Sequence, residues 1–361
     1  MKKRSDAGKT LLYFMVFAVV FSACETEDPV PRGKGTPGSQ GVFILNEGNP
    51  GSNDASLSYC NFETGQLTAD VLAGELGSLA QSMIAYGGKL YIVVCESSNL
   101  TVLDVETHEL VKRISVTDEN NQPRKPRYLA AYGRHVYAST IDGHVVRLDT
   151  ASLALDGVAK VGKNPEGIAA LNGKLYVANS GGWDYPAPPD STLSVVDIAR
   201  FEEEKKIRVG VNPYIVKADK RGNIYLTYQG DFFSNLPGGI QKLNTATGKV
   251  TTLDIPANQK FDLAGDLLYF YSLVYDENFN PVCTFGVYDT VKGERTSDPV
   301  ISDGTPMKSP NGIGVHPQTR EVYIADSYFP NKSRVYVFGT DGKKVRDFEA
   351  GIGANLFVFH P

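Results

Sequence analysis

Hydrophobic and polar positions alternate along most of the chain, in short runs separated by turns rich in Gly, Asn and Asp. Alternation of this kind is typical of half-buried β-strands, and the sequence contains no long run with the spacing of an amphipathic helix. One apolar run carries an aromatic residue that recurs at intervals of roughly 40 to 55 residues, close to the period of a four-stranded propeller blade. The seven recurring aromatics are Phe43, Tyr91, Tyr137, Tyr176, Tyr225, Tyr269 and Tyr323.

Each repeat has the same internal order. An apolar run such as 167–171 leads through a tight turn to the aromatic run at 174–180, and a variable loop leads on to two further runs at 193–197 and 205–209. The pattern predicts four antiparallel strands in each repeat. Because the faces of such repeats are buried only by their neighbours, they favour one ring over the two domains that the chain length alone would suggest.

The two ends of the chain complement each other. The first repeat lacks its first strand, whereas "NLFVFHP" at 355–361 resembles the first strand of the seventh repeat at 312–317. Pairing of the C-terminal segment with the first repeat would complete that blade and remove the free edges of the ring. We therefore predict an all-β protein, a seven-bladed β-propeller over residues 41–361, in which the first blade is closed by the C-terminal strand.

Residues 1–23 have the features of a targeting leader, with a basic start, an apolar run at 11–21 that is too short to span a bilayer, and small residues before Cys24. An apolar run that ends in two small residues and a cysteine resembles the lipobox of bacterial lipoproteins, in which this cysteine is acylated and anchors the protein. An ordinary secretory leader with a chance cysteine is the alternative. Residues 24–40 are polar and rich in proline, which predicts a flexible tether.

The tether begins with an acidic cluster of Glu25, Glu27 and Asp28. This cluster resembles the export signal that sends lipoproteins of the Bacteroidota to the outer face of the outer membrane. The resemblance implies a lipid-anchored protein of the outer membrane that is exposed at the cell surface. Removal of the leader lowers the formal net charge from −5 to −8, and an acidic domain without clusters of Lys and Arg is not expected to bind nucleic acid.

Three further cysteines, Cys60, Cys95 and Cys283, follow Cys24 in the chain. Their odd number argues against a disulfide framework, and their spacing is not that of a metal site. All three fall in apolar, strand-like stretches. We therefore expect them to be buried thiols.

Long loops gather on one face of the predicted ring, because the connections between second and third strands are long in five repeats and the hairpin turns of the opposite face are short. The long loops are 46–56, 180–192, 228–239, 272–282 and 326–334, and the connection at 117–126 opens onto the same face. Aromatic residues concentrated on one rim indicate a binding surface. The candidates are Trp183, Tyr185, Phe232, Phe233, Tyr275, Tyr328 and Phe329. Alternatively, these aromatics pack the loops against one another.

A second set of candidates lies at the mouth of the central channel, two positions before the apolar centre of each first strand. These residues are Gln81, Arg127, Glu166, Tyr214, Gln259, Asn311 and Asn355, and Tyr128 beside Arg127 is added to them. None of them is aliphatic. They could fix the orientation of a polar ligand, or they could merely hydrate a water-filled channel.

Motifs of catalysis are largely absent from the sequence, which has no nucleophile elbow, zinc-protease helix or phosphate loop. The histidines are dispersed, and His316 and His360 end equivalent strands, which favours a role in the repeat. The segment 309–327 resembles the repeat of NHL, gluconolactonase and strictosidine-synthase-like propellers. That resemblance implies a divalent cation held by Asn311 with Glu47 and Asp326, although other lactonase signatures are missing. We expect a protein that is not an enzyme and that needs no cofactor or metal.

The chain resembles YncE-like, YVTN-type propellers in two motifs. These are strands such as "KLYVAN" and the Asn-Pro pairs that begin at Asn164 and Asn212. Together with the lipobox and the acidic cluster, they make the chain similar to surface lipoproteins of the Bacteroidota, among them the BtuG-type propellers. Those proteins bind corrinoids (vitamin B12) and sit over a TonB-dependent, BtuB-like transporter. Three hypotheses stay open: corrinoid capture and delivery to such a transporter, binding of another surface ligand such as a glycan or peptide, and metal-dependent hydrolysis of a lactone.

Overall fold

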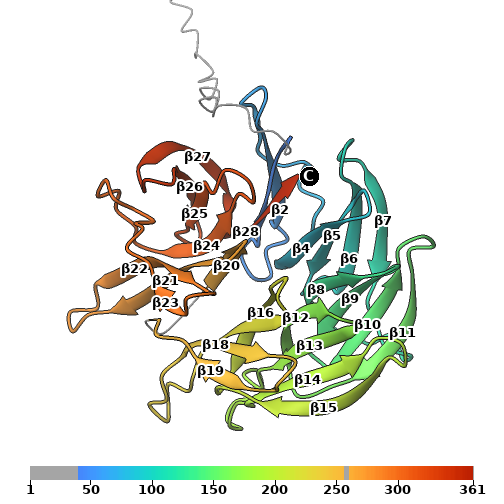
Figure 1. The fold of residues 1–361 in the computed structure, drawn as a ribbon. Coiled ribbons are helices and arrows are strands. Elements are labelled where there is room, and N and C mark those ends of the chain that lie inside the picture. Colours follow the sequence, from blue (N-terminus) through green and yellow to red (C-terminus); the bar gives the residue numbers. More distant parts are fainter. Residues whose placement is uncertain (1–39, 256–259, 361) are drawn as a thin grey trace, which may run out of the picture.

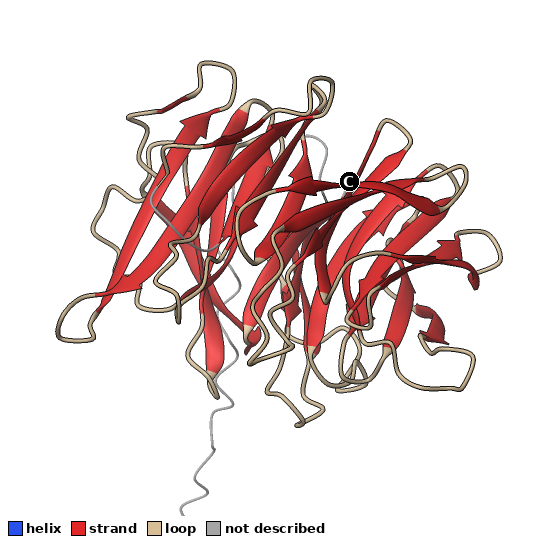
Figure 2. Cartoon of the chain, turned by 90° about the horizontal axis from the view of Figure 1, so that it is seen from below, coloured by secondary structure: helices blue, strands red, loops and turns tan. Residues whose placement is uncertain are grey.

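The computed structural model describes residues 40–255 and 260–360, and every regular element among them is a β-strand. The strands form seven four-stranded antiparallel sheets, arranged as the blades of one ring (Figure 1). A second view shows the strands crossing the ring, with loops at both of its faces (Figure 2). No helix in these ranges is long and apolar enough to cross a bilayer. The leader, Cys24, nearly all of the tether, and Gln259 lie outside the described residues.

In each blade the first strand named lies nearest the centre of the ring, and the others follow outwards. Blade 1 contains β28 (Ala354–His360), β1 (Gly41–Asn46), β2 (Ser56–Asn61) and β3 (Leu67–Thr68). Blade 2 contains β4 (Ala80–Tyr86), β5 (Lys89–Val94), β6 (Asn99–Asp104) and β7 (Leu110–Ser115). Blade 3 contains β8 (Pro126–Tyr132), β9 (His135–Thr140), β10 (His144–Asp149) and β11 (Ala154–Lys160).

The remaining blades follow the same order. Blade 4 contains β12 (Pro165–Leu171), β13 (Lys174–Asn179), β14 (Thr192–Asp197) and β15 (Glu202–Arg208). Blade 5 contains β16 (Pro213–Ala218), β17 (Asn223–Tyr228), β18 (Gly239–Asn244) and β19 (Val250–Thr252). Blade 6 contains β20 (Lys260–Ala264), β21 (Leu267–Tyr275), β22 (Pro281–Asp289) and β23 (Glu294–Arg295). Blade 7 contains β24 (Pro310–Val315), β25 (Val322–Asp326), β26 (Lys332–Phe338) and β27 (Lys344–Ile352).

The C-terminal strand closes the first blade, which confirms the prediction. Strand β28 pairs antiparallel with β1, from Gly41 opposite His360 to Leu45 opposite Leu356, and a bulge follows. The chain therefore joins its last strand to its first sheet, as Figure 1 shows. In a closed ring, every blade has a neighbouring blade on either side.

The recurring aromatics pack between blades. All seven are buried, and four of them, Tyr91, Tyr137, Tyr225 and Tyr323, have no exposed surface. Tyr91 of blade 2 belongs to a cluster with Leu129 and Val136 of blade 3. The two faces of a sheet are thus buried against the two neighbouring blades, as blade 2 shows with its clusters toward blades 1 and 3. Because each blade repeats this packing, the aromatics recur with the period of the blades.

The turns between third and fourth strands are capped by acidic or amide side chains at the strand end. In blade 2, Oδ1 of Asp104 accepts hydrogen bonds from the backbone N–H groups of Glu106 and Thr107, both at 2.9 Å. Asp149 and Asp289 form the same pair of bonds in blades 3 and 6. Such turns satisfy backbone donors locally, so the acidic residues of this face have a structural use.

The predicted loop at 272–282 is largely strand, and this part of the sequence prediction is wrong. Strands β21 and β22 continue as a hairpin as far as Tyr275 and Pro281. The turn beyond them is closed by Asp276, whose Oδ1 accepts two backbone N–H groups at 2.8 Å. Aromatic and β-branched residues favour extended backbone, and only the Asp- and Asn-rich centre of the segment has the chemistry of a turn.

Cys60, Cys95 and Cys283 are all unpaired, and the first two are buried as expected. Burial raises the pKa of the Cys60 thiol to about 11 and also raises that of Cys95. Cys283 is only partly buried, because it lies on the outer part of the β21–β22 hairpin. A thiol with a raised pKa is a poor nucleophile, so Cys60 and Cys95 serve packing.

Candidate functional site

The mouth of the channel is built from polar residues at the second position of six innermost strands. These residues are Gln81, Arg127, Glu166, Tyr214, Asn311 and Asn355. A register shift against the adjoining strand falls at or beside each of them. Because a bulge re-aims a side chain, six polar groups leave the regular alternation at the same level of the ring. We call these six residues, with Glu47, Tyr128, Trp183 and Lys260, the mouth.

Arg127 is the centre of one half of the mouth. Its guanidinium binds Glu166 through two hydrogen bonds, Nε to Oε2 at 2.8 Å and Nη2 to Oε1 at 3.1 Å. A third bond of 2.7 Å runs from Nη1 to Oε1 of Gln81. Arg127 is 3% exposed and Glu166 is 2% exposed, and burial alone would lower the pKa of Arg127, but the charge of Glu166 outweighs it and the pKa is raised. Burial raises the pKa of Glu166, and the charge and hydrogen bonds of Arg127 oppose this shift. The two hydrogen bonds of the pair hold both side chains in position.

Trp183 extends this network onto the rim. Its indole Nε1 donates a hydrogen bond of 2.7 Å to Oε1 of Glu166, and the guanidinium carbon of Arg127 lies 5.1 Å from the centre of the ring. The backbone N–H of Trp183 donates to Oδ1 of Asn164 at 3.2 Å. The residue nevertheless remains 56% exposed. Trp183 is thus an oriented aromatic platform with free surface, attached to a buried ion pair.

The other half of the mouth surrounds Glu47. One carboxylate oxygen accepts from Nδ2 of Asn311 and the other from Nδ2 of Asn355, both at 3.2 Å. Nζ of Lys260 donates to the backbone carbonyl of Asn311 at 2.5 Å, and burial lowers the pKa of this lysine against the opposing charge of Glu47. Sequence reasoning missed Lys260, because counting back along the first strand of blade 6 reached Gln259. The position of the lysine at the start of β20 was the signal that could have identified it.

Three tyrosines occupy the space between these halves. The rings of Tyr128 and Tyr214 meet edge to face, with centroids 5.7 Å apart, and Nε2 of Gln81 donates to the hydroxyl of Tyr128 at 3.3 Å. Burial raises the pKa of Tyr214 to about 12 and that of Tyr128 well above its ordinary value. Tyr271, which the sequence pattern did not single out, is likewise buried and has a raised pKa. All three remain neutral hydrogen-bonding groups near pH 7.

Below the mouth, the channel encloses a cavity of about 430 Å³. Tyr128, Lys260 and Asn355 contribute to its lining, which continues over small and aliphatic side chains of the innermost strands. Lys217 and Asp262 also line it and form an ion pair of 2.6 Å. The cavity is therefore largely apolar, with polar groups at particular points of its wall, a combination common in sites for small molecules.

The rim aromatics of blades 4 and 5 form a separate group. Tyr185 and Phe233 have ring centroids 5.2 Å apart, and Phe232 and Phe233 have centroids 5.8 Å apart. The exposed fractions are 71% for Tyr185, 74% for Phe233 and 89% for Phe232. The rings thus pack on one another, as the alternative interpretation holds, and still present a large apolar surface to solvent.

The last three rim candidates are not gathered at one place. Tyr275, 64% exposed, stands at the end of β21 on the extended hairpin of blade 6. Tyr328 and Phe329 follow β25 and are 41% and 47% exposed. A Cβ atom on Gly353 would lie 2.6 Å from the ring of Phe329 and 2.7 Å from Cγ of Glu47. Phe329 therefore borders the mouth beside Glu47.

Two groups of potential cation ligands occur in the described ranges. The first group contains the three residues of the predicted lactonase-type site. Asn311 donates a hydrogen bond to Glu47, whereas Oδ1 of Asp326 accepts the backbone N–H of Ser309 at 2.6 Å. Asp326 thus caps the connection that leads into β24. The second group, His135, Asp149 and Asp156, brings three ligand atoms within 4.8 Å. Both of its carboxylates already form ion pairs, with Arg134 and Arg147, which compete with a cation.

The family model described as "Domain of unknown function (DUF5074)" matches residues 40–353. No curated protein sequence matches the chain. Among solved structures, a candidate 6-phosphogluconolactonase from Bacteroides fragilis has a TM-score of 0.64 at 13% identity, over 91% of this chain and 100% of its own. Hydrazine synthase from Kuenenia stuttgartiensis has a TM-score of 0.61 at 17% identity, over 76% of this chain and 87% of its own. At these identities the likeness concerns the fold alone.

Proposed function

The chain belongs to the family described as Domain of unknown function (DUF5074), and we propose that it is a cell-surface lipoprotein that captures corrinoids. In this proposal, Cys24 carries the lipid anchor in the outer membrane. The captured corrinoid passes to a TonB-dependent, BtuB-like transporter. The protein acts by binding alone and catalyses no reaction.

The observation that carries the proposal is the arrangement of Trp183 over Glu166 and Arg127. A corrinoid is a broad, flat macrocycle with apolar faces and an edge of amide groups. The indole offers an apolar surface that is already oriented, and the same mouth carries amides and hydroxyls, such as those of Gln81, Tyr128 and Asn355. Because the side chains are held by hydrogen bonds before a ligand arrives, little ordering cost opposes binding.

The position of the first described residue supports an anchored domain with its mouth turned outwards. The carbonyl of Gln40 accepts the backbone N–H of Phe62 at 2.9 Å, so the ring begins at the short-turn face, opposite the mouth. A tether of the length of 24–40 reaches roughly 20 to 25 Å. The domain would therefore need to tilt on its tether in order to offer the mouth to a transporter.

A second candidate function, metal-dependent hydrolysis of a lactone, is favoured by the contact between Asn311 and Glu47. A carboxylate and an amide oxygen are ligands for hard cations such as Ca²⁺. Against this candidate, Glu47 is already bonded to two amides, and Asp326 accepts the backbone N–H groups of Lys308 and Ser309. A third candidate, a glycan or peptide ligand, would use the exposed rim aromatics.

Calorimetric titration of the tether-free domain with cyanocobalamin tests the proposal. We expect saturable binding of one ligand per protein that is unchanged by a chelator. A matched titration of the Asn311→Ala variant should retain part of the affinity. Absence of heat and saturation at micromolar protein would overturn corrinoid capture. A turnover of lactones that chelator abolishes would favour the hydrolase instead.

A further inference from the structure

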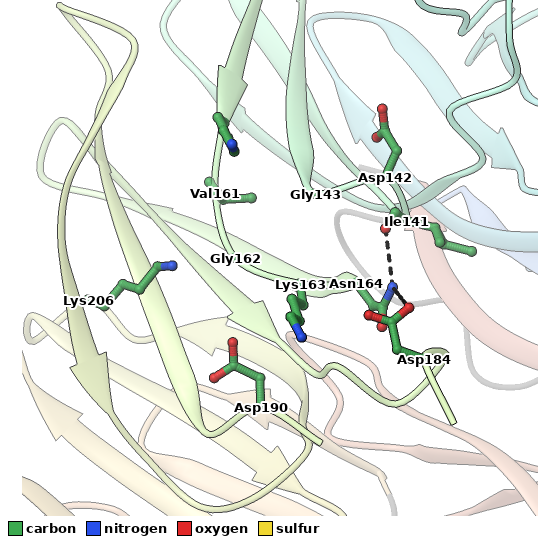
Figure 3. Close-up of a pocket in the computed structure, with 11 residues that line it drawn as sticks. Ile141, Asp142, Gly143, Val161, Gly162, Lys163, Asn164, Asp184, Asp190 and Lys206 are labelled. Carbon is green, nitrogen blue, oxygen red and sulfur yellow. Dashed lines mark hydrogen bonds between the residues drawn. The ribbon is translucent and has the colours of Figure 1, made fainter. Parts of the chain in front are cut away.

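A second cavity lies outside the mouth, between blades 3 and 4. It has a volume of about 500 Å³ and is lined by the loop after β9, the connection from β11 to β12, the long loop of blade 4 and one side chain of β15. Figure 3 shows Lys163, Asp190 and Lys206 at one end, and Asp142, Asn164 and Asp184 at the other. We call this cavity the lysine pocket.

The lysine pocket collects positive charge on an acidic protein. The ammonium groups of Lys160 and Lys163 form no ion pair or side-chain hydrogen bond with any residue that the structure describes, and both residues are exposed. The third ammonium, of Lys206, lies 3.9 Å from Glu203. Solvated lysines are common on surfaces, but these three come from two blades and line one cavity. Like charges brought together in this way favour an anionic ligand.

The acidic residues of the lysine pocket are not equivalent. Asp142 forms an ion pair with Arg124, a residue 7% exposed, and its Oδ2 lies 3.1 Å from Nδ1 of His144. Asp184 accepts a long hydrogen bond of 3.3 Å from Nδ2 of Asn164. Asp190 uses Oδ1 for the turn that follows it, while no hydrogen bond of Oδ2 is found within the described chain. Two carboxylates therefore retain free capacity to accept hydrogen bonds from hydroxyl groups.

We propose that the lysine pocket binds a phosphorylated sugar, with the phosphate at Lys163 and Lys206 and the sugar hydroxyls at Asp184 and Asp190. Lysine ammonium groups bind phosphate as point charges. The carboxylates would repel a phosphate that carries no sugar, but they accept hydrogen bonds from the hydroxyl groups of a sugar. The pocket therefore offers lysines for the phosphate and carboxylates for the sugar of the same ligand. This assignment uses none of the mouth residues.

The phosphorylated sugar has two sources. It is either a free phosphorylated saccharide or the ribose phosphate in the nucleotide loop of a complete corrinoid. The second source rests on the proposed function. It is compatible with the structure because one loop joins the two sites: Trp183 and Asp184 are neighbours, and Asn164 bonds both of them. A corrinoid on Trp183 would thus approach the lysine pocket from the side of the mouth.

The first experiment follows the amide chemical shifts of the domain during titration with ribose 5-phosphate. Ribose, which lacks the phosphate, is the uncharged control ligand. We expect saturable shifts for the phosphate ester that weaken with added salt. The double variant Lys163→Gln, Lys206→Gln should lose at least about tenfold in affinity, the size expected for charge-assisted hydrogen bonds. Lys205→Gln is the matched control, because Lys205 neighbours Lys206 in β15 and does not line the pocket.

The second experiment compares cyanocobalamin with dicyanocobinamide, which lacks the nucleotide loop. If the corrinoid is the source, the double variant should lose affinity for cyanocobalamin about tenfold and keep its affinity for dicyanocobinamide. A lysine-dependent response to ribose 5-phosphate, with no corrinoid binding at all, would retain the lysine pocket and remove the proposed function. If neither ribose 5-phosphate nor cyanocobalamin distinguishes the double variant from Lys205→Gln, the proposal is overturned.

Discussion

The indole nitrogen of Trp183 donates a hydrogen bond of 2.7 Å to Glu166, a residue only 2% exposed. This bond joins an exposed loop residue of blade 4 to the innermost strand of the same blade. Since Glu166 also binds Arg127 of blade 3, the platform and the ion pair form one unit across two blades. A change in any member should therefore alter both the stability of the ring and the orientation of the platform.

Removal of Arg127 should destabilise the fold. The Arg127→Met variant leaves Glu166 buried without its partner, so we expect the free energy of unfolding in urea to fall by about 3 to 5 kcal/mol. Arg221→Met is the control, because Arg221 and Asp266 form an exposed pair with side chains 54% and 53% accessible. That change should cost less than about 1 kcal/mol. Equal losses in the two variants would contradict a structural role for the buried pair.

Deletion of residues 355–361 should open the ring. The truncated chain lacks most of β28, which supplies the inner strand of blade 1, and so exposes an inner edge of the sheet. We expect a large fall in the melting temperature, or failure to fold, as followed by circular dichroism. Removal of residues 24–39 shortens the chain at the other end and should leave the melting temperature unchanged. An unaltered melting temperature after the C-terminal deletion would refute closure through β28.

Acid should weaken the fold partly through His108. Burial lowers the pKa of His108 below its ordinary value of 6.5, and the charge of His360 lowers it further. The unfolded chain then binds more protons than the folded chain as the pH falls through 6.5 toward the folded pKa, so stability declines over that interval. The His108→Gln variant should show a smaller decline in urea unfolding between pH 7 and pH 5, by about 1 kcal/mol or less. An unchanged slope would mean that His108 is not desolvated.

Anchoring should depend on Cys24. The Cys24→Ala variant is expected to lose its acyl chains and to release the domain in soluble form, as seen by fractionation of cells. Replacement of Glu25, Glu27 and Asp28 together should leave the protein lipidated but facing the periplasm. Protease added to intact cells distinguishes the two locations. Digestion of the triple variant at the wild-type rate would remove the acidic cluster as an export signal.

The ring could be predicted from the sequence because its determinants are periodic. Tyr91 and Tyr323 mark equivalent strands, and the position of Arg127 or Asn355 in its strand could be found by counting from the apolar centre. Lys260 was missed because the count selects one position in each first strand, and in blade 6 that position is Gln259, which lies outside the described residues. The count therefore passes over a charged residue that directly follows the selected position.

The spatial relations within the site could not be predicted from the sequence. The sequence predicts Trp183 as a loop aromatic and Glu166 as a residue of the channel mouth, but nothing in their spacing shows that they share a hydrogen bond. The lysine pocket was missed for a related reason, since Lys163 and Lys206 lie far apart in the chain and meet only where two blades adjoin. Exposed loops lack the periodicity that makes buried strands recognisable.

Fluorescence of Trp183 during titration with cyanocobalamin is the sharpest test of corrinoid capture, because this residue is the only tryptophan of the chain. We expect saturable quenching beyond the absorption of the ligand itself, and a Trp183→Ala variant whose corrinoid dissociates faster by at least about tenfold. Phe279→Ala, which removes an aromatic that is 85% exposed on the hairpin of blade 6, should dissociate at the wild-type rate. Unquenched fluorescence at saturating cyanocobalamin, or equal dissociation from all three proteins, would contradict a corrinoid site on Trp183.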